Sequence, residues 1–214
     1  MTKVEPRLDV RWLGTVPYTD AWTMQTDLHD RRARDEAPDT LLLLEHPHVY
    51  TVGRRGTRAD VLLDTDALAS RGVDVVETDR GGQVTYHGPG QLVGYPIVHL
   101  GARADVVRYL RDLEEALLRT LSDLGIDGSR DPEQTGVWVS DAKIAAIGVR
   151  ITRGVTKHGF AVNVSTDLSY FAGIVPCGIL DRGVTSVEAV LGAAPSVEEV
   201  AGVFAARFDE VFVR

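Results

Sequence analysis

The chain has 214 residues, of which 44% are hydrophobic and 25% are charged, and its formal net charge is −8 at neutral pH. These proportions are ordinary for a soluble globular protein, and the acidic balance argues against general nucleic-acid binding through phosphate contacts. The sequence has no secretory signal and no segment of roughly 18 uninterrupted apolar residues, as a membrane span needs. Its single cysteine, Cys177, permits no disulfide within the chain. We therefore expect one cytoplasmic, monomeric domain over residues 1–214, with neither nucleic acid nor membrane as partner.

The first part of the chain predicts strands interleaved with helices. Residues 8–13 alternate as a strand does, and residues 17–33 carry a helical apolar face that begins near a proline. Residues 40–45 are continuously apolar, which is typical of a strand buried on both faces. A turn and a short extended piece follow over residues 46–53, then an exposed loop over residues 54–60. Residues 65–70 predict a short helix and residues 73–77 a strand.

A glycine-rich stretch spans residues 80–91, with the sequence RGGQVTYHGPGQ. Glycine lets the backbone approach another molecule closely, and main-chain N–H groups among polar side chains suit the wall of a pocket for a polar or charged ligand. An irregular connection between two strands is the alternative. We favour a binding loop, anchored on a sheet by the β-prone segment of residues 92–100.

The second part predicts one long helix, a set of antiparallel strands and a helical end. A stripe at three- and four-residue steps predicts a helix over residues 105–124, ended by a glycine. Turn-rich residues 126–134 precede β-type segments at 136–139, 143–151 and 158–164, whose short connectors favour antiparallel pairing. A helical turn is expected at 167–171, and helices at 186–191 and 196–211. The helical stripe consists of Val106, Tyr109, Leu110, Leu113, Leu117 and Leu121.

These elements together predict the fold class. Strands and helices alternate along the chain without a repeat, a low-complexity segment or a linker that would divide it. The predicted architecture is α/β, a single domain with a mixed, largely antiparallel central sheet flanked by helices.

Cys177 is the candidate nucleophile, because Pro176 and Gly178 flank it in a bend that could present the thiol at the edge of a pocket. A buried cysteine that acts as a small hydrophobic residue is the alternative. A thiol with a pKa of about 8.5 is only a few per cent thiolate at neutral pH, so it needs a base or a cation nearby. No histidine or lysine lies within a few residues of Cys177, so any partner must come from elsewhere in the fold.

Lys143 is the first candidate for that partner. It opens an apolar strand, where a desolvated lysine could stabilise a thiolate, although a strand-end lysine that reaches into water is the commoner case. Lys157 with His158, and then His87 and His46, are further candidates, His46 being more typical of a turn residue. The sequence contains neither a metal-ligand spacing nor a phosphate-binding loop of the Gly-x-x-x-x-Gly-Lys-Ser/Thr type, so we expect no cofactor.

Five motifs occur together and in order: His46-Pro-x-Val-Tyr-Thr-x-Gly53, Arg80-Gly-Gly-Gln-Val-Thr-Tyr-His-Gly-Pro-Gly-Gln91, Lys143-Ile-Ala-Ala-Ile-Gly148, His158-Gly-Phe-Ala-x-Asn163 and Phe171-x-x-Ile-x-Pro-Cys-Gly178. This set resembles the lipoyl(octanoyl) transferases, the octanoyl-[acyl-carrier-protein]:protein N-octanoyltransferases of lipoate biosynthesis. The resemblance extends from about residue 8 to residue 211. One motif would be weak evidence, but five in register are specific. The resemblance implies the fold of biotin–protein and lipoate–protein ligases.

The resemblance also implies an acyltransferase that works without a cofactor. Cys177 would attack the thioester of octanoyl-acyl carrier protein, and Lys143 would lower the pKa of the thiol and shuttle the proton. A lysine of a lipoyl domain would then take the octanoyl group as an amide. The implied acceptors are lipoyl domains of 2-oxoacid dehydrogenase complexes or the glycine cleavage H protein.

Substrate-binding positions follow from the same resemblance. Loop amides would reach the thioester carbonyl, and small and apolar side chains would line a tunnel for an eight-carbon chain. Because carrier proteins are acidic, docking needs a basic face, which we expect at Arg54, Arg55, Arg58 and Arg80. The implied substrate-binding residues are Arg80, Gly81, Gly82, Gln83, Val84, Thr85, Tyr86, His87, Ala146, Ile147, Gly148, Gly159, Phe160 and Ala161.

Two alternatives remain at this point. An ATP-dependent lipoate– or biotin–protein ligase could use the same fold, but it forms an acyl-adenylate and has no use for a pair of Cys177 and Lys143. A non-catalytic binding protein of the same fold would lack the nucleophile, whereas every candidate catalytic position here is filled.

Overall fold

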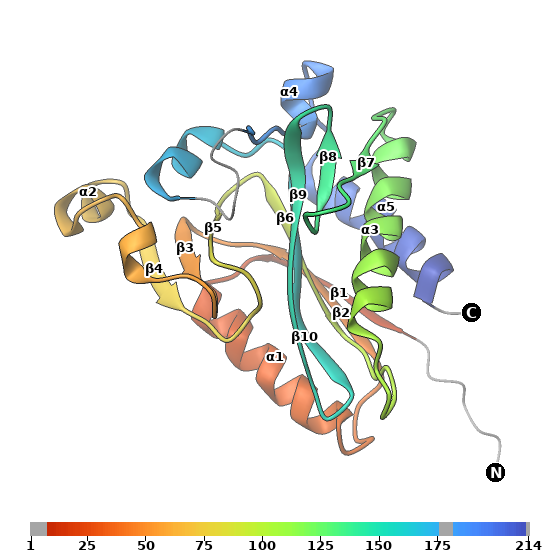
Figure 1. Cartoon of the computed structure of the whole chain (residues 1–214). Coiled ribbons are helices and arrows are strands. Elements are labelled where there is room, and N and C mark those ends of the chain that lie inside the picture. The colour runs from red at the N-terminus through yellow and green to blue at the C-terminus, as the bar shows by residue number, and fades with distance from the viewer. Residues whose placement is uncertain (1–7, 176–181, 213–214) are drawn as a thin grey trace, which may run out of the picture.

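The computed structural model describes residues 8–175 and 182–212, and a seven-stranded sheet forms its centre (Figure 1). The strands are β1 (Asp9–Thr15), β2 (Thr40–Glu45), β6 (Gln91–Ile97), β7 (Ser129–Arg130), β8 (Val137–Val139), β9 (Ala142–Thr152) and β10 (Val155–Asn163). Their order is β1-β2-β6-β10-β9-β8-β7. β1 runs parallel to β2, and every other neighbouring pair is antiparallel. The expected mixed, largely antiparallel central sheet is confirmed.

Helices cover both faces of this sheet. The long ones are α1 (Tyr18–Arg32), α3 (Val106–Asp123) and α5 (Val197–Phe212). α3 and α5 lie side by side against one face, and α1 lies against the other (Figure 1). β2 serves both layers, because successive side chains of a strand point to opposite faces. Leu41 and Leu43 pack in the core beneath α3 and α5, whereas Leu42 and Leu44 pack in the core beneath α1. The strand predicted to be buried on both faces is therefore buried on both faces.

A smaller, three-stranded sheet stands beside the large one. It contains β3 (Val49–Val52), β4 (Asp74–Glu77) and β5 (Val84–His87), in the order β4-β3-β5. The sequence predicted extended residues at β3 and β4, but it predicted a continuous loop where β5 lies. β5 forms because Val84 and Tyr86 alternate into a separate apolar cluster, while the glycines fall in the turns on either side. The glycine-rich stretch is thus a short loop, a strand and a tight turn.

The remaining elements are short. They are η1 (Arg58–Asp60), α2 (Thr65–Ser70), η2 (Leu168–Gly173) and α4 (Val187–Leu191). η1 lies in the segment that was predicted as a loop, and η2 at the predicted helical turn. In the part of the chain that the structure covers, no helix combines the length and the hydropathy that crossing a bilayer requires.

The predicted stripe of α3 is buried only in part. Tyr109, Leu113 and Leu117 are buried against the large sheet and α5. Val106, at the start of the helix, is 46% exposed and lies outside the core, although it belongs to the same stripe. Val106 lies beyond the edge of the core and lines a cavity next to the sheet.

The loop of residues 79–83 connects β4 to β5 and is fastened to the large sheet by Asp79. The carboxylate accepts hydrogen bonds from His158 Nε2 (2.5 Å), from Lys157 Nζ (3.1 Å) and from Arg150 Nη1 (2.9 Å). Donation from His158 and then from Lys157 holds the pKa of Asp79 well below its usual range. Three donors on β9 and β10 therefore hold the first residue of the loop.

Arg80 fastens the same loop to the small sheet. Its guanidinium donates from Nη2 to the Thr51 carbonyl (2.5 Å) and to Thr51 Oγ1 (2.8 Å) on β3. The side chain is buried, with the whole residue 7% exposed. Arg80 therefore does not belong to the expected basic face on the surface, because its guanidinium is buried and hydrogen-bonded to Thr51.

The ties of Asp79 lead to a stability prediction. Folding lowers the pKa of Asp79, so its carboxylate adds to the free energy of unfolding. This contribution is fully present above the pKa of the unfolded state, about 3.9, and is lost as the pH falls toward the pKa of the folded state. We expect Asp79→Asn to lower the free energy of unfolding by about 1–2 kcal/mol at pH 7, with a smaller difference from wild type at pH 3. Urea denaturation at both pH values measures this.

Asp35→Asn is the matched control, since Asp35 also pairs with an arginine but is 86% exposed. It should change the free energy of unfolding by less than about 0.5 kcal/mol. Equal losses in the two variants, or a loss for Asp79→Asn that is the same at pH 3 and pH 7, would contradict the anchoring role.

Candidate functional site

A cavity of about 650 Å³ lies between the loop of residues 80–87 and strands β9 and β10. This volume is within the usual range of ligand pockets, about 300–1,000 Å³. Its wall contains Lys143 and, apart from Tyr86, every residue that the sequence assigned to substrate binding. The structure thus brings together residues 80–87, 143–148 and 159–161, which are far apart in the chain.

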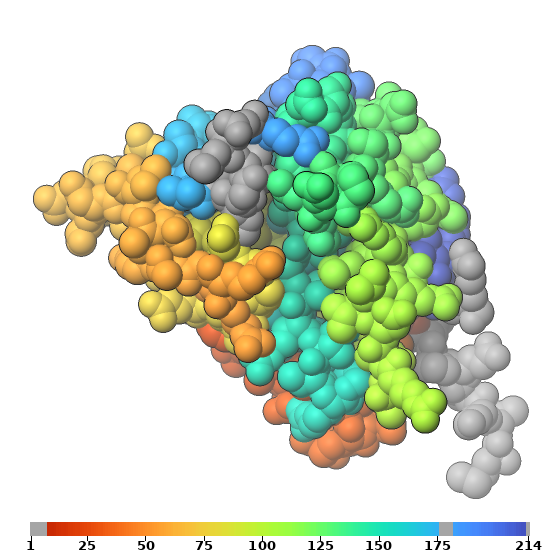
Figure 2. Space-filling view, in the orientation of Figure 1, coloured from red at the N-terminus to blue at the C-terminus, as the bar shows by residue number. Residues whose placement is uncertain are grey.

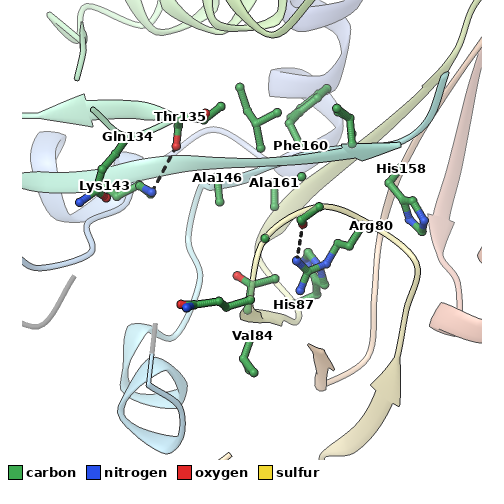
Figure 3. Close-up of a pocket in the computed structure, with 18 of the residues that line it drawn as sticks. Arg80, Val84, His87, Gln134, Thr135, Lys143, Ala146, His158, Phe160 and Ala161 are labelled. Atoms are coloured by element: carbon green, nitrogen blue, oxygen red, sulfur yellow. Dashed lines mark hydrogen bonds between the residues drawn. The ribbon is translucent and has the colours of Figure 1, made fainter. Parts of the chain in front are cut away.

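Four small residues form the floor of this cavity. Ala161 on β10 is paired with Ala146 on β9, and Gly159 is paired with Gly148. Each pair lies two positions from the other, so all four residues share one face of the sheet. Figure 3 shows Ala146 and Ala161 pointing to the side of the strands on which Val84 lies. The cavity exists because these positions carry no side chain beyond a methyl group.

Glycines also bring the roof of the cavity close to its floor. A Cβ atom on Gly148 would lie 2.9 Å from the Gly81 carbonyl oxygen, and one on Gly53 would lie 2.5 Å from the Gly82 oxygen. The N–H of Gly81 donates to the Val149 carbonyl at 3.1 Å. This amide therefore holds the loop on β9, and the predicted contact between loop amides and a ligand carbonyl has to involve other amides.

Lys143 lies at one end of the floor, near the start of β9 (Figure 3). Its ammonium donates to the Thr135 carbonyl (3.3 Å) and lies 4.7 Å from the centroid of the Trp138 ring. The face of an indole ring attracts a cation. The Lys143 backbone pairs with the chain that follows residue 181: its N–H donates to the Gly183 carbonyl, and its carbonyl accepts from Thr185. Both interactions place the lysine next to this returning segment.

Cys177, the predicted nucleophile, lies outside the described residues. The described chain on either side of it reaches the cavity wall, at Phe171 before it and at Val184 after it.

Lys157 and His158, which the sequence suggested as alternative partners of the thiol, lie at the other end of the cavity. Both are engaged with Asp79, and Lys157 also lies 5.8 Å from the Trp22 ring centroid. Burial lowers the pKa of His158, against the opposing effect of Asp79. His158 has a φ of 60°, a conformation that non-glycine residues rarely adopt. These residues hold the loop rather than face Lys143.

Two buried histidines lie behind the loop. His46 hydrogen-bonds through Nδ1 to the Val16 carbonyl (2.6 Å) and through Nε2 to the Tyr95 hydroxyl (2.7 Å), and burial lowers its pKa to about 4. His46, whose sequence context suggested a turn residue, follows β2 directly and is fully buried. Burial, and then the neighbouring His46 and Arg80, lower the pKa of His87 well below its ordinary value. Both imidazoles are therefore neutral at physiological pH.

Tyr86 points away from the cavity. Its hydroxyl hydrogen-bonds to His48 Nδ1 (2.8 Å), and its ring stacks on Tyr170 with centroids 5.0 Å apart. The side chain is fully buried in the cluster of the small sheet. Tyr86 is therefore not part of the cavity wall.

Several wall residues were not assigned to substrate binding from the sequence. Gln91 and Asn163 end two of the motifs, so a signal for them existed. Val106 and Leu110 gave none, because they belong to a regular core-like stripe. Tyr18 and Tyr95 come from α1 and β6, whose sequences read as ordinary structural elements. Within residues 8–175 and 182–212, no three His, Cys, Asp or Glu side chains are grouped so that they could hold a metal ion.

The sequence of residues 17–209 matches the family model for the lipoyl protein ligase A/B catalytic domain. An octanoyltransferase of Mycobacterium marinum is 52% identical over 206 residues, covering 92% of this chain and 85% of the relative. An octanoyltransferase of Rubrobacter xylanophilus is 55% identical over 188 residues, covering 86% of this chain and 85% of the relative.

Solved structures show the same fold at much lower identity. The structure of a bipartite lipoate protein ligase and its E2 lipoyl domain from Thermoplasma acidophilum matches with a TM-score of 0.74 and 21% identity, covering 97% of this chain and 85% of the other. Biotin protein ligase from Aquifex aeolicus matches with a TM-score of 0.54 and 11% identity, covering 96% and 69%. By the family model and by relatives above half identity, this chain belongs to the lipoyl protein ligase A/B catalytic domain family.

Proposed function

We propose that this protein transfers an octanoyl group from octanoyl-acyl carrier protein to a lysine of a lipoyl domain, through a thioester on Cys177. Octanoyl transfer follows from the relatives above half identity, which are octanoyltransferases. The observation that carries the site is the cavity, in which Lys143 stands at one end of a floor of glycine and alanine. An unbranched acyl chain can lie along such a floor. A lipoyl domain as acceptor is supported by its presence in the related Thermoplasma structure.

The chemistry consists of two exchanges at one carbonyl carbon. The Cys177 thiolate attacks the carrier thioester, a new C–S bond forms, and the carrier thiol leaves with a proton. The lysine amine of the acceptor then attacks, the C–N bond forms, and the C–S bond to Cys177 breaks. Thioester exchange is nearly neutral in free energy, and conversion of a thioester to an amide is downhill. The reaction therefore needs no nucleotide.

Lys143 is the proposed cationic partner of the thiol. The alternatives have other roles in the described structure: His87 is buried and neutral, and Lys157 is engaged with Asp79 at the far end of the cavity. Lys143 remains next to the chain that returns from Cys177, with its ammonium on the Trp138 face. A charged ammonium near a thiol favours the thiolate and lowers the pKa of the thiol.

A ligase that activates its acid with ATP is the alternative for this fold. Its support is the likeness to lipoate and biotin ligases, at about 20% identity or less, which shows the fold alone. The relatives above half identity are octanoyltransferases, and a ligase needs no cysteine nucleophile. Transfer without ATP is therefore the reading that we adopt.

Three exposed arginines support a docking site for the acidic carrier protein. Arg54, Arg55 and Arg58 are exposed, and none of them forms an ion pair with another described residue. Arg55 also lines the cavity. In Figure 2 their segment, in orange, lies on the surface opposite the yellow-green start of α3, with teal strands between the two. A carrier bound at these arginines would have its acyl thioester beside the cavity.

The first test concerns the nucleophile. We expect Cys177→Ser to lose octanoyl transfer to a lipoyl domain, because a serine hydroxyl is far less nucleophilic than a thiolate at neutral pH. Intact-mass measurement after incubation with octanoyl-carrier protein should show one added octanoyl group on wild type and none on the variant. Thermal denaturation should show an unchanged fold. Near-normal transfer by Cys177→Ser would refute covalent catalysis at this residue.

The second test concerns Lys143. The apparent pKa of the Cys177 thiol, followed by the pH dependence of iodoacetamide alkylation, should rise most in Lys143→Ala, since the thiolate loses its stabilising cation. His87→Ala and Lys157→Ala are the matched controls and should shift the titration less. If the apparent pKa of the thiol changes in His87→Ala but not in Lys143→Ala, the partner of the thiol is a histidine instead.

The third test concerns the carrier-protein face. Replacing Arg54, Arg55 and Arg58 together by Glu should raise KM for octanoyl-carrier protein by about tenfold or more at low salt, and the effect should shrink at high salt because ions screen exposed charges. Arg11, Arg31 and Arg34 replaced by Glu give the same change of net charge on β1 and near α1, and should leave KM nearly unchanged. Equal effects of the two triple variants would exclude a specific docking face.

A further inference from the structure

A chain of hydrogen bonds assigns the proton on His87. Asn163 Nδ2 donates to the Thr185 carbonyl (2.9 Å), so Asn163 Oδ1 is the atom that accepts from Gln91 Nε2 (2.9 Å). Gln91 Nε2 also donates to the Tyr86 carbonyl (3.2 Å), so Gln91 Oε1 faces His87 Nδ1 (2.8 Å). Backbone carbonyls can only accept. Nδ1 of His87 therefore carries the proton, and Nε2 carries a lone pair.

The donors of this chain all point the same way, from His87 toward the Thr185 carbonyl. The N–H of Thr185, which belongs to the preceding peptide group, donates to the Lys143 backbone carbonyl (3.0 Å). Hydrogen bonds aligned in this way polarise one another, and donation from Nδ1 makes the opposite ring nitrogen a better proton acceptor. Two residues of the cavity wall, one on the loop side and one on β9, are joined through the interior of the protein.

His46 provides the contrast, because both of its nitrogens are occupied. Nδ1 donates to the Val16 carbonyl, and Nε2 accepts from the Tyr95 hydroxyl. No such donor is found for His87 Nε2 among the described residues, and His87, unlike His46, lines the cavity (Figure 3). The Tyr18 ring stacks at 14° on the His87 imidazole and restricts its rotation. A fixed, neutral imidazole thus offers one lone pair to whatever enters the cavity.

We propose that His87 is a catalytic residue of the second half of the reaction, in which its Nε2 accepts a proton from the attacking lysine amine. This inference rests on the proposed function. A neutral amine must bind to the acyl-enzyme, and its nitrogen becomes strongly acidic once it has attacked the carbonyl. His87 takes that proton as the C–N bond forms, and the departing sulfur receives it as the C–S bond breaks. The products are the amide, the free thiol and neutral His87.

The fixed, neutral tautomer of His87 suits this step better than the first one. In the first half the thiol must be ionised before attack, for which a cation such as Lys143 is appropriate. In the second half the attacking group carries protons that have to be removed, and a neutral acceptor is required. The hydrogen-bond chain provides such an acceptor, because it places the proton of His87 on Nδ1 and leaves the lone pair on Nε2.

The test measures only the second half of the reaction. Wild type, His87→Asn, His87→Gln and His46→Asn are first acylated with octanoyl-carrier protein to completion, as judged by intact mass. A lipoyl domain is then added, and loss of the acyl-enzyme is followed in a single turnover. Asparagine retains a donor for Gln91 Oε1 at the place of Nδ1 but has no Nε2, so His87→Asn removes the acceptor alone. His87→Gln lacks a basic nitrogen as well and serves if His87→Asn unfolds.

We expect both His87 variants to transfer about 10²- to 10⁴-fold more slowly than wild type, the usual loss when a general base is removed. His46→Asn should melt at a lower temperature and transfer within a few-fold of wild type. Transfer from acylated His87→Asn at the wild-type rate, or an equal loss in His46→Asn, would overturn the assignment of His87 alone. Failure of wild type to form an acyl-enzyme would instead overturn the proposed function and this inference with it.

Discussion

The close approach of the loop of residues 80–83 to strands β9 and β10 is the constraint on which the site depends. Gly148 on β9 allows it, because a Cβ there would meet the Gly81 carbonyl. Asp79 maintains it through three donors on the two strands. The cavity is what remains between them where alanine and glycine leave the floor bare. A side chain at Gly148 would displace the loop, and longer side chains at Ala146 or Ala161 would fill the space.

Backbone hydrogen bonds also join this loop to residues 53–55, which belong to the surface that we propose for carrier docking. The N–H groups of Gly53, Arg54 and Arg55 donate to the carbonyls of Gln83, Arg80 and Gly82, at 2.8, 3.0 and 3.0 Å. The segment that carries the exposed arginines is thus hydrogen-bonded directly to the loop that forms the roof of the cavity. A protein bound at these arginines would contact the backbone segment that forms the roof of the cavity.

Burial divides the titratable groups of the site into two kinds. His46 and His87 are neutral because burial disfavours the imidazolium, and burial also raises the pKa of Tyr18 to about 12 and that of Tyr95 well above its ordinary value. Lys143 is half-buried, with its ammonium against the Trp138 ring. In the mechanism that we propose, the cation at one end of the site assists thiolate formation, and the lone pair on His87 Nε2 assists amine attack.

The sequence by itself predicted most of the strands and the long helices, because these depend on local periodicity, and its motifs, through the family resemblance, identified many residues of the cavity wall. It did not determine that Tyr86 faces the small sheet, that Arg80 is buried, or that Val106 leaves the core of α3. Each of these depends on which face of an element meets a second element packed against it. The same holds for the proton on His87, since carbonyls from residues as distant as Thr185 assign it. Tertiary packing decided orientation and protonation, which no local pattern encodes.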